Sequence, residues 1–295
     1  MTRMLTACVA VGLLVAATAS TAPAKPLVGG AWSHGAGKAD GAVPLASPPV
    51  SATGNGSTAT ATATCPTGTK AVGGGFNAPA SGDAVALVYE SVKVRQRTWR
   101  SSMQLLDRGD PDTGTLTTYV YCDQQVPATH TVAVTLPTTG QVHVGPTAKA
   151  SCPPGQVTMA GGFRMPAPLI PPTVTSLFFD SLRSGTGAWD TRVVTGPAGP
   201  SSFTSEAYCG PRPKAPVEAS GLSDPNAVDS SRSTAGADCP NDLSPAAGGF
   251  AQPDSSVISF FFVDQSMRVG DGWQVSAVHS GGEPAISLRA AVYCS

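Results

Sequence analysis

Acidic side chains that lie close together are the first candidates for chemistry in this chain. Asp107, Asp110 and Asp112 fall within the string DRGDPDTG at 107–114. Carboxylates at such spacing can bind calcium, or act as the acid and base of a hydrolase. The acids do not recur in TGPAGP and SGGEP, the segments at the same place in the two other copies of an internal repeat. We therefore interpret DRGDPDTG as a polar hairpin turn, and keep an exported hydrolase using these aspartates as the alternative function.

A second set of acids does recur, once in each copy of the repeat. Each acid stands nine residues before a tryptophan and is followed by a base three or four positions later. The three sets are Glu90, Lys93 and Trp99; Asp180, Arg183 and Trp189; Asp264, Arg268 and Trp273. One interpretation is three equivalent shallow sugar sites, in which a carboxylate accepts sugar hydroxyls and a ring stacks on the sugar. The other is that the acids bind local backbone groups and the tryptophans pack in the core.

The repeat that carries these residues has three copies. Its opening string reads CPTGTKAVGGGF at 65–76, CPPGQVTMAGGF at 152–163 and CPNDLSPAAGGF at 239–250, at intervals of 87 residues. Each copy closes with a Tyr-Cys pair, at Cys122, Cys209 and Cys294. Apolar, β-branched stretches separated by turn residues predict strands throughout each copy, with an extra strand before its first cysteine. Glycines within a strand predict a bulge, or a ring or backbone lying against the strand.

The six repeat cysteines predict a disulfide framework. Six cysteines allow fifteen pairings, but the symmetry of the copies selects Cys65–Cys122, Cys152–Cys209 and Cys239–Cys294. Each bridge closes a loop of more than 50 residues, for which the chain-entropy model gives about 4 kcal/mol. A metal site finds no support, because the sequence has no CxxC string and its four histidines share no position in the repeat.

Composition excludes several functions. Charged residues make up 13% of the 295 residues and the formal net charge is −1, so no basic face for nucleic acid is expected. No motif predicts a cofactor, and the glycine-rich strings lack the Lys-Ser/Thr pair and following helix of a phosphate loop.

The N-terminus has the pattern of a secretory signal peptide. Arg3 precedes an apolar run from Leu5 to Ala17, and small-residue cleavage sites end at Ala19 and Ala24. We predict cleavage after Ala24, which removes the seventh cysteine, Cys8, and leaves a secreted, extracellular chain without a membrane span.

The opening string C-P-x-G-x(4)-G-G-G-F, with a later tryptophan and a closing Y-C, resembles a repeat of uncharacterised exported proteins of actinobacteria. The resemblance covers residues 43–295 and implies secretion and β structure, with no activity to transfer. The third copy departs from it, with Asn241-Asp242 at the first turn. Three such units are also similar, more distantly, to the vitelline membrane outer layer proteins, which implies a three-sided β-prism.

These observations predict an all-β fold of three homologous antiparallel repeats, packed around a pseudo-threefold axis rather than as three tandem β-sandwiches. The expected parts are a signal peptide (1–24), a flexible lead (25–55), and repeats 1 (56–125), 2 (126–212) and 3 (213–295). We predict a secreted, non-enzymatic binding or structural protein of the cell envelope or extracellular space. In its most specific form it is a multivalent binder of a cell-wall or extracellular polysaccharide. In that form the ligand-binding residues are Glu90, Asp180, Asp264, Trp99, Trp189 and Trp273.

Overall fold

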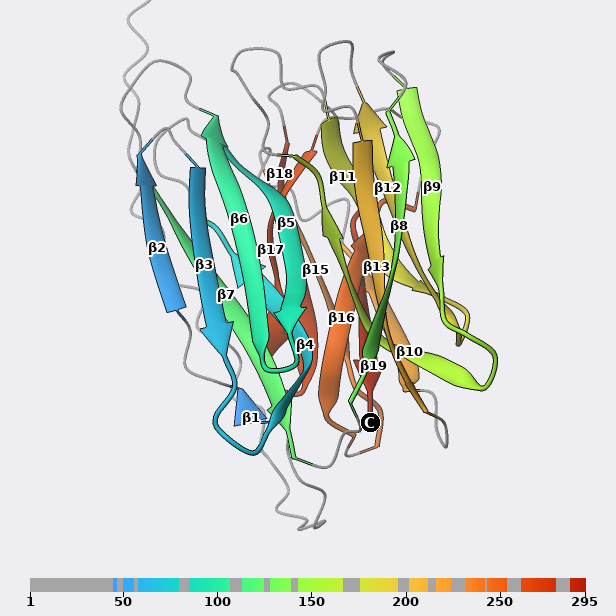
Figure 1. Ribbon diagram of the computed structural model, residues 1–295. Helices are drawn as coiled ribbons and strands as arrows, with labels where there is room; N and C mark the ends of the chain where they lie inside the picture. Colours follow the sequence, from blue (N-terminus) through green and yellow to red (C-terminus); the bar gives the residue numbers. More distant parts are fainter. Residues whose placement is uncertain are drawn as a thin grey trace, which may run out of the picture. The chain divides into compact units, whose positions relative to one another are not determined.

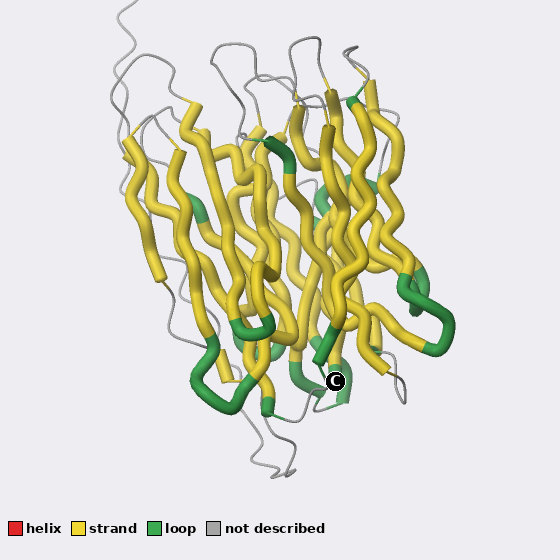
Figure 2. Tube along the Cα trace, in the orientation of Figure 1, coloured by secondary structure: helices red, strands yellow, loops and turns green. Residues whose placement is uncertain are grey.

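In the computed structural model, the described part of the chain consists almost wholly of β-strands (Figure 2). It describes residues 45–46, 50–55, 58–79, 85–106, 113–124, 128–138, 143–166, 176–195, 202–211, 216–223, 232–241, 243–253, 261–279 and 287–295. All of these belong to one unit, Asp40–Ser295. In this part of the chain no helix is long and apolar enough to cross a membrane.

The strands form three antiparallel sheets (Figure 1). Sheet A contains, in spatial order, β1 (Leu45–Ala46), β7 (Thr113–Asp123), β4 (Lys70–Asn77), β17 (Phe261–Val269), β18 (Gly272–His279) and β15 (Arg232–Asp238), with β2 (Val50–Asn55) also paired to β7. Sheet B contains β3 (Thr58–Thr64), β6 (Thr98–Leu106), β5 (Val85–Arg95), β10 (Gln156–Arg164), β13 (Ser202–Pro211) and β8 (His130–Pro137). Sheet C contains β14 (Val217–Leu222), β19 (Arg289–Cys294), β16 (Pro245–Ala251), β11 (Ser176–Ser184), β12 (Ala188–Thr195) and β9 (His143–Ser151).

Every sheet is shared between two repeats. Repeat 1 gives β3, β5 and β6 to sheet B and its other strands to sheet A; repeats 2 and 3 divide their strands in the same way. The halves join through short ladders, β5 with β10, β11 with β16, and β17 with β4. Because repeat 3 completes the sheet that repeat 1 begins, the arrangement is cyclic. Three tandem sandwiches are therefore excluded, and the pseudo-threefold packing is confirmed.

The interior faces of the sheets meet in a common apolar core. The strands alternate accordingly: in β3 the alanines are buried and the threonines exposed. One phenylalanine from each opening string lies at the centre, where the ring of Phe163 is 6.1 Å from that of Phe76 and 5.7 Å from that of Phe250. The core cluster takes buried residues from all three sheets.

All three expected disulfides are present, with Cα–Cα distances of 5.6–5.7 Å. Each one joins two sheets. Cys65 follows β3 of sheet B and Cys122 lies in β7 of sheet A; the other two bridges connect sheet C with B, and A with C. The bridges thus hold together the edges where the sheets meet, as well as closing their own repeats.

The extra strand before each first cysteine is also confirmed, as β2, β8 and β14. For repeat 1 this moves a boundary. Val50–Asn55, which we expected within the flexible lead, forms β2 because it pairs with β7 from Thr113 to Thr118.

Candidate functional site

The three tryptophans of the expected sugar sites lie in the interior. Trp99, Trp189 and Trp273 are 1%, 1% and 2% exposed. Each indole Nε1 donates a hydrogen bond of 2.9–3.0 Å to a serine hydroxyl of the preceding strand, on Ser91, Ser181 and Ser266. The rings offer no face to a ligand, so their assignment as stacking platforms is wrong and the core interpretation holds.

One glycine in each glycine string leaves the space that the tryptophan ring occupies. A Cβ atom on Gly74, Gly161 or Gly248 would lie 2.2, 2.0 or 2.1 Å from an indole atom of Trp99, Trp189 or Trp273. The following glycine in each string packs against backbone: a Cβ on Gly162 would lie 2.6 Å from the Ser91 carbonyl oxygen. Both expected causes of strand glycine are therefore present, and the β-strand also bulges just before it.

The tyrosines of the closing Tyr-Cys pairs link successive repeats. The hydroxyl of Tyr208 accepts a 2.7 Å hydrogen bond from the backbone N–H of Lys93, and Tyr293 and Tyr121 accept equivalent bonds from Arg183 and Arg268. Each ring also packs edge-on against the tryptophan of that other repeat, at 5.4–5.5 Å between centroids. Burial raises the pKa of all three phenols. The sequence suggested these tyrosines as rings against the strand glycines but not as links between repeats, although their strict recurrence was a signal of this role.

The three acids are not equivalent, which corrects the prediction. Counted from the serine that binds the tryptophan, Glu90 and Asp180 stand one residue before Ser91 and Ser181, whereas Asp264 stands two before Ser266. The position equivalent to Glu90 in repeat 3 is Gln265, which pairs across the β17–β18 ladder with Ser276, as Glu90 pairs with Ser102. The hairpin between the serine and the tryptophan is one residue shorter in repeat 3, because its turn is shorter than that of repeat 2 and it lacks the bulge between Lys93 and Arg95 of repeat 1. Counting back from the tryptophan therefore shifts the register.

The acids are also buried and paired with arginine. Glu90, Asp180 and Asp264 are 8%, 8% and 2% exposed. Arg100 binds both carboxylate oxygens of Glu90 at 2.6 and 3.0 Å, and Arg232 binds Asp264 at 2.6 and 3.1 Å. Arg192 pairs with Asp180, which also accepts the backbone N–H of Gln252. Burial raises the pKa of Asp180 and of Asp264 to about 6, opposed by the neighbouring arginines.

The bases that follow the acids in sequence have a different role. Lys93 Nζ lies 5.7 Å from the Tyr208 ring centroid, and the Arg183 guanidinium carbon lies 4.6 Å from that of Tyr293. Lys93 donates to the Ala71 carbonyl at 3.1 Å and to Thr129 Oγ1 at 2.5 Å, and Arg183 donates to the Pro216 carbonyl. Thr129 and Pro216 both lead into the next repeat, so these cations fasten each repeat to the one after it.

One acid was missed because it occurs in a single copy. Glu206 of β13 is buried, accepts the Tyr208 hydroxyl at 2.9 Å and pairs with Arg164 at 3.2 Å. Burial raises the pKa of this carboxyl.

The remaining candidates lie outside the described residues or find no site within them. Asp107, Asp110 and Asp112 lie outside the described residues. Within the described segments no three His, Cys, Asp or Glu side chains gather to hold a metal ion. A cavity of about 20 Å³ lies among the strand glycines, phenylalanines and tryptophans, and one of about 10 Å³ lies among apolar residues of the core. Volumes of this size accommodate about one water molecule each and no substrate.

The chain was also compared with known proteins. No protein-family model matches it, and neither does any curated protein.

Proposed function

We propose that this protein is secreted and acts without catalysis, as a rigid binding or structural component of the cell envelope or extracellular space. The observation that carries the proposal is the placement of its three disulfides, one at each junction between sheets. Disulfides persist in oxidising compartments outside the cytosol. The predicted signal peptide and the resemblance to exported actinobacterial repeats support the same location.

The use made of the repeated residues supports a non-enzymatic role. The tryptophans, tyrosines and serines hold repeats together, and the acids of the repeat are saturated by arginine and hydroxyl groups. Carboxylates whose oxygens are already bound by arginine and hydroxyl groups are not available to accept a proton from a substrate, which acid–base catalysis requires.

Polysaccharide remains the proposed partner, now on a different surface. Six side chains in cross-strand register form a polar row across sheet B, in which Thr60, Arg164 and Thr135 are exposed and Ser102, Glu90 and Thr204 are buried between them. Hydrogen bonds of 2.8–3.0 Å connect neighbours at both ends of the row. An extended row of hydroxyl and charged groups suits the hydroxyls of a flat polymer chain.

The test is to produce the full chain in an exporting host and recover it from each cell fraction. The expected product lies outside the cytoplasm, begins after Ala24 and shows the three disulfides in non-reduced peptide maps. Retention on peptidoglycan, chitin or cellulose, reduced by Arg164→Gln with Thr60→Ala, would identify a binding protein; no retention would leave the structural role. Recovery of a reduced protein from the cytoplasm would contradict the proposal.

A further inference from the structure

The turn between β5 and β6 of repeat 1 differs in charge from its two counterparts. All three turns make the same backbone contact: Cys65, Cys152 and Cys239 donate to the carbonyls of Arg97, Gly187 and Asp271 at 2.7–3.0 Å. Repeat 2 turns through Gly185 and repeat 3 through Gly270, both with positive φ, the usual solution for a tight turn. Repeat 1 instead has the sequence Arg95-Gln96-Arg97. The fold does not demand these arginines, because the other copies make the turn without them.

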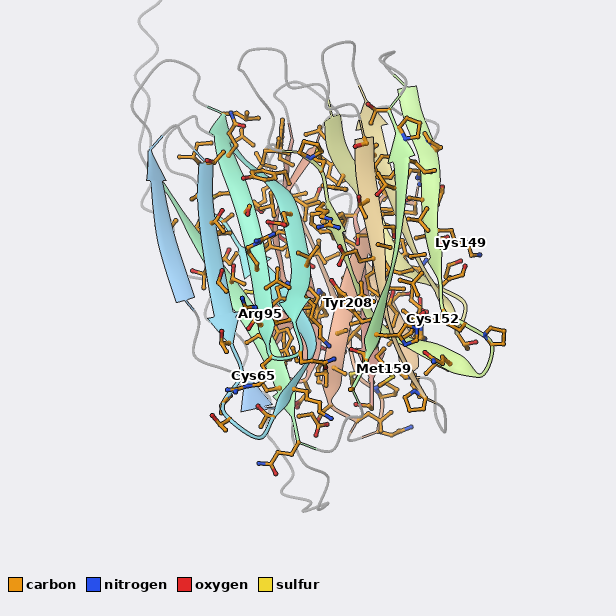
Figure 3. The ribbon with its side chains drawn as sticks, viewed as in Figure 1. Cys65, Arg95, Lys149, Cys152, Met159 and Tyr208 are labelled. Atoms are coloured by element: carbon orange, nitrogen blue, oxygen red, sulfur yellow. A yellow bond between two sulfur atoms is a disulfide. The ribbon has the colours of Figure 1, made fainter. Side chains whose placement is uncertain are left out.

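The turn gathers basic side chains from two strands. The N–H of Ala71 donates to the Gln96 carbonyl at 2.9 Å, which places Lys70 at the start of β4 beside the turn. Lys93 Nζ reaches the Ala71 carbonyl from β5. Arg97 holds the Cys65 carbonyl through Nε and Nη2, and Arg95 is exposed at the end of β5. Figure 3 labels Arg95 and Cys65 at this end of the strands.

Few acids balance these charges. Asp123 of β7 lies opposite Lys70 in the ladder, and Glu206 lies behind the Tyr208 hydroxyl. Among the described residues, the ion pairs do not include Lys93, Arg95 or Arg97. Burial, together with the charge of Lys70, lowers the pKa of Lys93 to about 8. Lys70 and Lys93 therefore repel each other, a cost that a bound anion would relieve.

At the equivalent ends of the other repeats an acid lies beside the basic residues or replaces one of them. In repeat 2 Arg183 pairs with Glu218, which also pairs with Arg289. In repeat 3 the residue equivalent to Arg97 is the acid Asp271. Basic residues within the turn itself are thus specific to repeat 1.

We propose that this end of repeat 1, comprising Lys70, Lys93, Arg95 and Arg97, binds the anionic groups of an extracellular glycopolymer. The groups are phosphodiesters or carboxylates, both of which pair with guanidinium and ammonium groups. The inference rests on the proposed function and names its ligand class. A single flexible polymer strand fits a site confined to one turn of a chain whose formal net charge is −1.

The test measures binding of linear polyphosphate and of polygalacturonate, the two sources of negative charge, with dextran as the neutral polymer. The variant combines Arg95→Ser, the residue found as Ser184 in repeat 2, with Lys70→Gln. We expect affinity for at least one polyanion to fall roughly tenfold. The slope of log K against log salt should fall by about 1.4, since about 0.7 is lost for each of the two phosphate contacts removed, as on single strands.

The control removes two basic residues of sheet C, Lys149→Gln with Arg289→Gln, and should change affinity less than about threefold. Equal losses in both variants would overturn the proposal, as would no binding of native protein to either polyanion. Tighter binding of single-stranded DNA than of both polymers would overturn the ligand class. A secreted, correctly bridged protein without polyanion binding would reject this site alone, whereas the cell fractionation tests the proposed function.

Measuring the binding affinity at two pH values tests whether Lys93 belongs to the site. Affinity of the native protein should fall between pH 7 and pH 9 as Lys93 loses its proton. Lys93→Arg, the residue at this position in repeats 2 and 3, stays charged and should bind equally at both values. The groups around Lys93 that also enter this balance are Lys70, Asp123, His130 and Glu206. The same fall in Lys93→Arg would show that Lys93 does not cause the pH dependence and would remove Lys93 from the site.

Discussion

The contacts in the interior recur in all three repeats, whereas those on the outer faces of the sheets differ from repeat to repeat. In the interior, the tryptophan ring of each copy packs against a glycine and its indole N–H donates a hydrogen bond to a serine. A tyrosine from another repeat packs against the edge of the same tryptophan. Outside, the buried acids take their arginines from three different strands: Arg100 of β6, Arg192 of β12 and Arg232 of β15 have no common position. Close packing admits one solution for the interior, whereas a charge on a solvent face needs only some partner within reach.

The strongest way to break the interior pattern is to put a methyl group where a ring lies. Gly161→Ala places a Cβ atom 2.0 Å from the Trp189 ring, between two sheets that cannot separate. We expect the free energy of unfolding in urea to fall by about 3 kcal/mol or more. Gly187→Ala is the control, because its Cβ meets nothing within 4 Å, and should change stability by less than about 1 kcal/mol. Similar losses in both variants would contradict the packing argument.

Removing single tyrosine hydroxyls sharpens the comparison. Tyr208→Phe, Tyr293→Phe and Tyr121→Phe each leave a backbone N–H without its acceptor, at about 1–3 kcal/mol. Tyr208→Phe should cost most, because it also takes a donor from buried Glu206. Thermal and urea unfolding of the three variants would measure this order. If Tyr208→Phe were the mildest, Glu206 would have no part in the network.

The acids on the outer faces predict how stability depends on pH. The pKa values of Asp180 and Asp264, about 6 in the folded chain, exceed their ordinary values near 3.9. A raised folded pKa stabilises the fold at low pH, and this contribution is lost as pH rises through 6. We expect the free energy of unfolding to fall by about 1–2 kcal/mol per carboxyl between pH 4 and pH 7. Asp180→Asn with Asp264→Asn should flatten this part of the profile, and an unchanged profile would show that the arginines offset the burial.

The smallest effect is expected where the repeats already exchange residues. Lys93→Arg places over Tyr208 the guanidinium that Arg183 places over Tyr293. Stability should change by less than about 1 kcal/mol, measured by thermal unfolding. A large loss would mean that the bond from Lys93 to Thr129 cannot be replaced.

Some of this structure could be predicted from sequence and some could not. Strand positions and disulfide pairs followed from the repeat, because equivalent residues must make equivalent bonds. The exchange of strands between repeats could not be predicted from the sequence, since a pairing of β5 with β10 needs the same kinds of residue as a pairing within one copy. The prediction of three equivalent acids failed for a simpler reason: a hairpin shorter by one residue moved Asp264 out of register. Ser266, seven residues before its tryptophan where Ser91 and Ser181 stand eight before theirs, was the signal that could have corrected this.

The cyclic exchange of strands limits which changes in the number of repeats still give a folded chain. A solenoid gains or loses a unit by recombination and still folds, because each unit contacts only its neighbours. Here a deletion from Cys65 to Cys152 would yield a chain with two copies, in which half-sheets would face no complement and leave strand edges open to aggregation. The number of copies is therefore set by ring closure at three. Variation must proceed by substitutions and short length changes within copies, as the arginines of the first turn and the shorter hairpin of repeat 3 show.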